Sequence, residues 1–210
     1  LLDGDLGPNT GGMGAYSPAP VVTPEIHART LREVIMPTVQ GMESEGITYT
    51  GFLYAGLMIS PDGGIKVLEF NCRMGDPETQ PIMLRLKTNF LHIVEHAING
   101  TLDKVEVEWD RRTALGIVMA AANYPDTPRK GDVMTGLPNR ASEDAHVFHA
   151  ATGLRDGQVV ATGGRVLCVT ALGDTVKAAQ RRAYEIADAI HFDGCQMRRD
   201  IGHKAIGRKK

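Results

Sequence analysis

Two side chains at the end of a predicted strand, Glu69 and Asn71, are the residues best suited to chemistry in this sequence. Residues at positions i and i+2 of a strand point to the same face, so this carboxylate and this amide oxygen are expected side by side. Such hard oxygen donors suit Mg²⁺, which usually shares its coordination with substrate phosphates. The turn that follows adds Arg73, Asp76 and Glu78, and a core strand rarely ends in so many charges without a ligand. The sequence therefore favours a ligand site here, although a solvated, salt-bridged loop would contain the same residue types.

A glycine-rich segment near the start of the chain is the second candidate. Residues 7–16 read Gly-Pro-Asn-Thr-Gly-Gly-Met-Gly-Ala-Tyr, and closely spaced glycines let backbone N–H groups converge on an anion. The segment is not a P-loop, because no Lys-Ser/Thr follows the glycines, and it is not a dinucleotide fingerprint, because no apolar strand precedes it. A flexible surface loop is the alternative interpretation.

The elements that position these candidates are predicted from apolar periodicity and turn residues. We expect a loop over residues 1–20, a helix from a Thr23 cap to a stop at Gly46, and a hairpin whose second strand, Ile65–Phe70, lies in a core. The further predicted elements are a first hairpin strand over 49–59, helices over 77–86 and 89–99 (the latter capped by Thr88), strands over 113–122, 147–152, 158–162 and 165–170, and a helix after an Asp174 cap. A charged, irregular stretch over 101–112 indicates a domain boundary, so we expect domains at 1–108 and 109–210.

Composition narrows the class of protein. The 210 residues are 42% hydrophobic and 23% charged, as in ordinary soluble globular proteins. A net charge of −2 gives no reason to expect nucleic acid or an anionic membrane as a partner, and no apolar run is long enough to span a bilayer. The three widely spaced cysteines suit a reducing cytosol, so we expect a cytoplasmic location. The chain lacks an initiator Met and is expected to be a fragment.

Two other patterns are weaker candidates. His92-Ile93-Val94-Glu95-His96 matches an inverted zinc-protease motif, but no second acidic helix supplies a third ligand, so ordinary helix residues are the favoured interpretation. Arg165 follows two glycines and could bind an anion, although a surface arginine is the simpler reading.

Two long motifs, residues 7–20 and 69–81, closely resemble the phosphoribosylamine–glycine ligase (glycinamide ribonucleotide synthetase) family of the ATP-grasp superfamily. Residues 50–58 and 163–170 are also similar to that family. The resemblance implies an α+β fold, in which the second lobe of an ATP-grasp domain, an antiparallel sheet with helices, precedes a small mixed α/β C-terminal domain. It covers only part of the family's length, so the N-terminal part of the same enzyme is an expected partner.

The resemblance also implies a reaction. In this family ATP phosphorylates the carboxylate of glycine, and the amine of 5-phosphoribosylamine attacks the acyl phosphate to give the amide, ADP and phosphate in purine biosynthesis. The resemblance assigns Glu69 and Asn71 to Mg²⁺ (or Mn²⁺). One departure concerns the strand over 49–59, which has no carboxylate for the second metal position found in many ATP-grasp enzymes.

The remaining roles are hypotheses. Arg73 could stabilise the acyl phosphate or the sugar phosphate, and Asp76 and Glu78 could hold a ribose hydroxyl or the substrate ammonium, with Arg73 and Asp76 as catalytic residues. The other predicted binding residues are Gly11, Gly12, Met13 and Gly14, which could close over substrate, and Gly75 and Pro77. Two alternatives stay open: another ATP-grasp carboxylate–amine ligase, and a binding module or non-catalytic fragment. The fragment alone is expected to be inactive.

Overall fold

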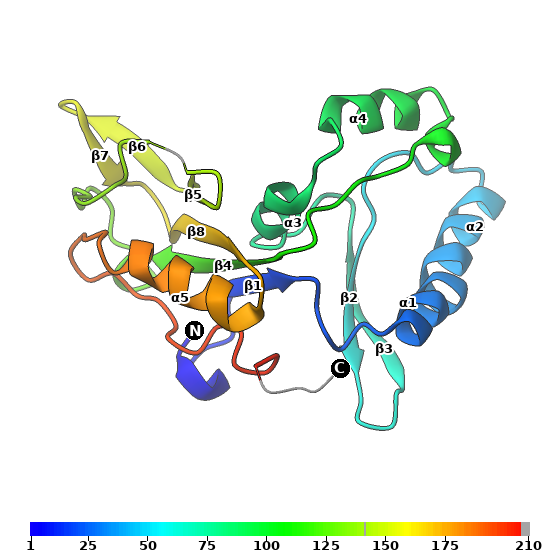
Figure 1. Cartoon of the computed structure of the whole chain (residues 1–210), viewed down its shortest axis with the longest axis horizontal. Helices are drawn as coiled ribbons and strands as arrows, with labels where there is room; N and C mark the ends of the chain where they lie inside the picture. Colours follow the sequence, from blue (N-terminus) through cyan, green and yellow to red (C-terminus); the bar gives the residue numbers. More distant parts are fainter. Residues whose placement is uncertain (141, 207–210) are drawn as a thin grey trace. The chain divides into compact units, whose positions relative to one another are not determined.

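A computed structural model describes residues 1–140 and 142–206 (Figure 1). The chain forms two compact units, and each is described by itself. Unit 1 comprises Leu1–Ser17, Asp76–Leu86 and the described residues from Trp109 onward, and unit 2 comprises Pro18–Gly75 and Lys87–Glu108. The chain passes from unit 2 to unit 1 at the sequence-based domain boundary between residues 108 and 109. The predicted division into domains at 1–108 and 109–210 stays a prediction, because unit 1 also contains two segments from before residue 109. Residues 207–210 of the second predicted domain lie outside the described residues.

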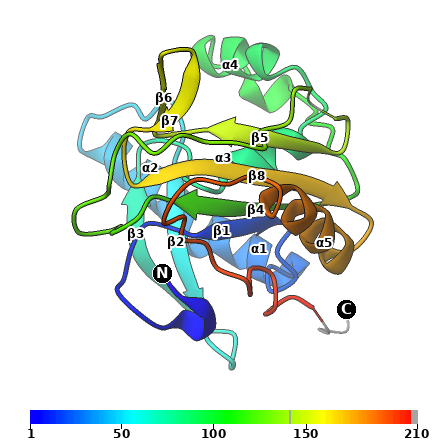
Figure 2. The ribbon, with the colours of Figure 1, turned by 90° about the vertical axis from the view of Figure 1, so that its left-hand side faces the viewer.

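Unit 1 is built on a four-stranded antiparallel sheet with the strand order β1-β4-β8-β5 (Figure 2). Its strands are β1 (Gly14–Ser17), β4 (Thr113–Ala120), β5 (Ala145–His149) and β8 (Arg165–Gly173). All of β4 and the seven inner residues of β8 are buried. Strands covered on both faces read as continuous apolar runs, and here α5 (Val176–Ala187) and α3 (Thr79–Arg85) contact both central strands. A separate hairpin of β6 (Thr152–Arg155) and β7 (Gln158–Ala161) follows β5.

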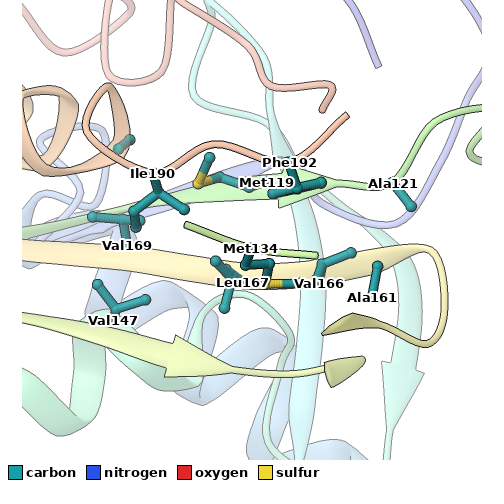
Figure 3. Close-up of a cluster of buried hydrophobic side chains, with 11 residues drawn as sticks. Met119, Ala121, Met134, Val147, Ala161, Val166, Leu167, Val169, Ile190 and Phe192 are labelled. Carbon is teal, nitrogen blue, oxygen red and sulfur yellow. The ribbon is translucent and has the colours of Figure 1, made fainter. Parts of the chain in front are cut away.

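The main core of unit 1 is formed by β4, β8 and the segment after α5. Met119 of β4 and Val169 of β8 are fully buried in one cluster with Ile190 and Phe192 (Figure 3). Burying each such side chain contributes about 1.5–3 kcal/mol relative to leaving it exposed. The absence of a side chain at Gly173 lets α5 approach the end of β8 closely, since a Cβ added there would lie 2.3 Å from the backbone nitrogen of Ala179.

Unit 2 consists of helices and one hairpin. Its elements are α1 (Pro24–Thr30), a π-helical turn (Leu31–Ile35), α2 (Met36–Ser44), β2 (Tyr54–Ile59), β3 (Ile65–Asn71), α4 (Phe90–Ile98) and a 3₁₀ turn (Leu102–Lys104). Thr23 caps α1 as predicted, with Oγ1 accepting the N–H of Ile26 at 3.2 Å. The π turn precedes Pro37, which has no N–H to continue the α-helical pattern. Within the described residues, no helix is both long and apolar enough to cross a membrane.

The antiparallel sheets with packed helices confirm the α+β class, whereas several details of the sequence prediction are wrong. The predicted loop over residues 1–20 contains β1, and β6 was not expected. Asn89 rather than Thr88 caps α4, because its Oδ1 accepts the N–H of Leu91 at 2.9 Å. Thr88 instead accepts the N–H of Glu108 at 2.7 Å. Thr175 rather than Asp174 caps α5.

The apolar residues of β3 are exposed, so the prediction that this strand lies in a core is also wrong. Val67, Leu68 and Phe70 are 42%, 64% and 43% exposed. Among the described residues β3 pairs only with β2, in a sheet of two strands, and such a hairpin leaves both faces open unless another element covers them.

A charged network joins the beginning of unit 1 to its C-terminal segment. Arg198 donates to both carboxylate oxygens of Asp200, each at 2.7 Å, and to Asp5 Oδ1 at 2.9 Å. Asp200 Oδ2 also accepts the backbone N–H of Gly4 at 2.8 Å. The Arg198 guanidinium is the main reason that the pKa of Asp200 lies well below its usual range. Folding therefore favours the ionised form of Asp200.

We predict that Asp200→Asn lowers the free energy of unfolding by about 1.5–3 kcal/mol at pH 7, because charged hydrogen bonds between mostly buried groups are lost. A carboxyl whose pKa is depressed on folding stabilises the protein above its unfolded pKa, and this contribution is lost as the pH falls. The difference from wild type should therefore shrink below about pH 4, in urea unfolding followed by circular dichroism.

Asp126→Asn is the matched control, because Asp126 is exposed and makes no ion pair within the described residues. Equal destabilisation by both substitutions, or a difference that stays constant down to pH 3, would contradict the assignment.

Candidate functional site

The two metal-ligand candidates lie on β3 in unit 2. Glu69 is opposite Gly56 of β2, and Asn71 is opposite Tyr54. Because both belong to one strand two residues apart, their side chains leave the same face. The register shifts directly before Glu69, where Leu68 has no partner on β2. Such bulges commonly re-aim the side chains that follow them.

The surroundings of this pair suit an oxygen-coordinated cation. Glu69 is exposed and Asn71 is half-buried, and a Cβ added at Gly56 would lie 3.0 Å from Cγ of Glu69, so the glycine leaves room for the carboxylate. No cluster of three or more His, Cys, Asp or Glu residues suited to a metal occurs in the described part of the chain. Two oxygen donors completed by phosphate and water fit Mg²⁺, which seldom occupies an all-protein cage.

Arg73 lies next to this pair in the same unit. Its Nη1 donates to the carbonyl of Met74 at 2.9 Å, and its Nη2 lies 3.4 Å from Oδ1 of Asn71. The side chain is exposed, so its remaining N–H groups face solvent and can donate to an anion beside the pair.

In unit 1, the glycine-rich loop and the turn at Asp76 are joined by Arg165, the first residue of β8. Its Nη1 donates to the carbonyl of Gly12 at 3.1 Å and to the carbonyl of Asp76 at 2.7 Å. Its Nη2 lies 3.0 Å from Oδ2 of Asp76, and the arginine side chain is 23% exposed. We call Arg165, Gly12 and Asp76 the Arg165 clamp.

The glycine-rich loop is packed against the body of unit 1. A Cβ added at Gly12 would lie 2.6 Å from Cδ of the buried Pro77, and one at Gly11 would lie 2.8 Å from Cζ of Arg165. Met13 is 5% exposed, and its carbonyl accepts the N–H of Val118 at 3.0 Å. Held at these points, the loop does not fit the alternative of an unattached surface loop.

The acidic residues of the following turn are positioned by the same unit. Asp76 is 47% exposed and lies within 3.5 Å of Nε2 of Gln80 in addition to its contacts with Arg165. Glu78 is half-buried directly before α3, where a negative charge is favoured by the helix dipole.

The predicted site residues thus form two sets, which the structure describes separately. Glu69, Asn71, Arg73 and the buried Gly75 belong to unit 2, and Gly11–Gly14, Asp76, Pro77 and Glu78 belong to unit 1. Sequence reasoning missed the clamp, because Arg165 is 153 residues from Gly12 and 89 from Asp76. Its two preceding glycines were the only local signal. The zinc alternative is not supported: His92 and His96 contact each other edge to face, and Nδ1 of His96 faces Thr101.

Two family models match this chain. The model described as "Phosphoribosylglycinamide synthetase, ATP-grasp (A) domain" matches residues 1–79. The model described as "Phosphoribosylglycinamide synthetase, C domain" matches residues 114–204.

Two curated relatives share the same name. A phosphoribosylamine–glycine ligase of Ralstonia nicotianae is 68% identical over 208 residues, which are 99% of this chain and 49% of the relative. The corresponding ligase of Pseudomonas aeruginosa is 60% identical over 99% of this chain and 48% of its own length. The chain therefore spans about half the length of the curated relatives it matches.

Solved structures agree with the fold. The crystal structure of phosphoribosylamine–glycine ligase from Thermotoga maritima has a TM-score of 0.83 and 41% identity, over 96% of this chain and 49% of that one. The biotin carboxylase domain of a thermophilic 2-oxoglutarate carboxylase has a TM-score of 0.61 at 10% identity, over 88% of this chain and 41% of that one. The second likeness concerns the ATP-grasp fold alone.

We predict that Arg165→Gln loosens the glycine-rich loop and the Asp76 turn together. Loss of the charged hydrogen bonds should raise amide hydrogen exchange about tenfold in peptides covering residues 7–16 and 74–80, measured by mass spectrometry. Arg155→Gln is the matched control, because Arg155 also donates from an exposed position to a backbone carbonyl of unit 1, that of Gly131 at 2.8 Å. Unchanged exchange in the two peptides of the Arg165 variant would refute the clamp.

Proposed function

The chain belongs to the phosphoribosylglycinamide synthetase family, and on that premise we propose that it is the C-terminal half of an ATP-dependent ligase that joins glycine to 5-phosphoribosylamine. The observation that carries the proposal is the succession of the two family matches, ATP-grasp domain and then C domain, along one chain. The activity would belong to purine biosynthesis in the cytoplasm.

The proposed reaction has two steps. The γ-phosphoryl group of ATP is transferred to a carboxylate oxygen of glycine, which gives glycyl phosphate and ADP. The amine of 5-phosphoribosylamine then forms the amide bond while phosphate leaves with the electrons of the broken C–O bond, and a proton is lost from the nitrogen. Such phosphoryl transfer requires positioning and charge neutralisation more than covalent participation by the protein.

Residues of unit 2 are proposed to handle the phosphates. Glu69 and Asn71 would hold Mg²⁺ or Mn²⁺, which when bound supplies charge neutralisation for the phosphates of ATP. Arg73 would donate to the acyl phosphate or the sugar phosphate, since its guanidinium is exposed next to Asn71. Gly75 would allow the backbone to pass close to the ligand.

Residues of unit 1 are proposed to bind and orient substrate. Asp76 and Glu78 would accept hydrogen bonds from a ribose hydroxyl or the substrate ammonium, and Arg165 would keep the Asp76 carboxylate in one orientation. Backbone N–H groups of Gly11–Gly14, next to Pro77, would contact substrate. Because the clamp fixes this loop, we assign it the role of a preformed wall rather than a mobile lid.

A binding module without turnover is the second candidate, and one observation favours it: the chain spans about half the length of its curated relatives. Calorimetry with Mg²⁺ and ATP on the 210-residue chain tests whether this half of the enzyme binds nucleotide by itself. Measurable binding would mean that this half suffices to hold nucleotide, whereas none would mean that the other half is needed.

We predict that a chimera of the N-terminal half of the Ralstonia nicotianae relative and this chain releases ADP only when glycine and 5-phosphoribosylamine are both present. Glu69→Gln should lower its kcat by about 100-fold or more, because the metal loses its charged ligand. The measurement is coupled ADP release at saturating Mg²⁺ and ATP.

Glu45→Gln is the control, since Glu45 is an exposed carboxylate in the same unit at the end of α2. Wild-type turnover by the Glu69 variant would contradict the metal assignment. ADP release with another amino acid or ribosyl amine in place of the two substrates would instead favour a different carboxylate–amine ligase.

A further inference from the structure

Unit 1 contains a cavity of about 320 Å³ that shares no residue with the proposed ligase site. It lies between β5, residues 137–140 with Ser142, and α5, at the opposite edge of the sheet from β1. Leu137, Pro138, Val147 and Ile186 supply its apolar lining, and Val147 is continuous with the main core. The volume is at the lower end of the range of about 300–1,000 Å³ for small-molecule sites.

The polar part of the lining consists of cationic and hydrogen-bonding groups. Arg140, Arg182, His146 and His149 line the cavity together with Ser142, and none of its lining residues is acidic. An apolar wall with a few convergent polar groups is the usual composition of a ligand site. Because these groups are positively charged or donate hydrogen bonds, they favour an anionic ligand.

Acidic residues near the rim are already engaged. Asp144 accepts a hydrogen bond from Oγ of Ser142 at 2.7 Å, and its Oδ2 lies 3.3 Å from Nε of Arg182. Arg182 also lies 3.7 Å from Glu185. These two carboxylates offset part of the charge of Arg182, although such exposed ion pairs are weak.

Arg140 and His149 can each make further hydrogen bonds. Arg140 makes no hydrogen bond or ion pair within the described residues, although a guanidinium carries five donors. His149 uses Nδ1 against Oγ1 of Thr152 at 3.1 Å, which leaves Nε2 for another partner. His146 packs edge to face against Phe148, on the face of β5 opposite to Val147 and His149, so its imidazole is not assigned to the anion.

We propose that this cavity binds a small organic anion, a carboxylate or phosphate carried on a compact apolar body. The apolar body contacts Leu137, Pro138 and Ile186, and the anionic group accepts hydrogen bonds from Arg140 and from Nε2 of His149, which leaves β5 on the same face as Val147. This site is independent of the proposed ligase activity, because binding at it needs neither ATP nor the other half of the enzyme.

Titration of the ¹⁵N-labelled chain by NMR tests the proposal, with phenyl phosphate and benzoate as probes. Amides of residues 145–149 and 182–186 should shift, and phenyl phosphate should bind at least about tenfold more tightly than inorganic phosphate, since it adds apolar contact. Benzyl alcohol, which has the ring without the charge, should cause no saturable shift. If phenyl phosphate binds more tightly than benzoate, the preferred anionic group is a phosphate, and in the reverse case it is a carboxylate.

Arg140→Gln should weaken phenyl phosphate binding about tenfold, through the loss of charge-assisted hydrogen bonds. Arg181→Gln is the matched control, because Arg181 is on α5, is 78% exposed and does not line the cavity. Equal binding by the Arg140 variant and the unmodified chain would overturn the proposal. So would equal affinity for phenyl phosphate and inorganic phosphate, or shifts confined to other parts of the chain.

Discussion

The antiparallel pairing of β4 with β8 is the constraint on which unit 1 depends. Its ladder runs from Thr113 opposite Gly173 to Ala120 opposite Arg165, and every residue of β4 is buried. β1 adds to the free edge of β4 and β5 to the free edge of β8. The glycine-rich loop therefore enters the sheet at one edge, and the cavity at β5 forms at the other. A change in the register of β4 against β8 would therefore displace both the glycine-rich loop and the cavity.

The same pairing determines where the Arg165 clamp forms. Arg165 is placed opposite Ala120 at a shift of register, and α3 lies close to the sheet because Gly116 has no side chain. A Cβ there would lie 3.0 Å from Sγ of Cys168 and 3.3 Å from Cγ of Pro81. This close approach brings the start of α3, and with it Asp76, within reach of the arginine. Burial raises the pKa of the Cys168 thiol to about 12, so it serves packing rather than nucleophilic chemistry.

The sequence predicts well what depends on neighbours along the chain. The apolar residues over 65–70 predict the strand, the spacing of two residues predicts the common face of Glu69 and Asn71, and Thr23 predicts a helix cap. It predicts poorly what depends on distant partners. β1 reads Gly-Ala-Tyr-Ser, which carries little strand propensity, and it becomes a strand because β4 offers it a partner. Leu68 and Phe70 look like core residues, yet burial requires a covering element that local pattern does not reveal.

The glycines of the first motif show how an argument from the sequence alone can be incomplete. Their spacing suggests backbone N–H groups that converge on an anion, which would require only that the loop be unobstructed. The structure adds a second reason: a Cβ at Gly12 would collide with the ring of Pro77, and one at Gly11 would displace the guanidinium of Arg165. The two reasons are compatible, because the contacts that exclude a Cβ also hold the backbone in one conformation. A backbone anion site gains affinity when its N–H groups are positioned before the ligand arrives. In the proposed ligase, the packing against Pro77 and the hydrogen bond from Arg165 would supply this preorganisation.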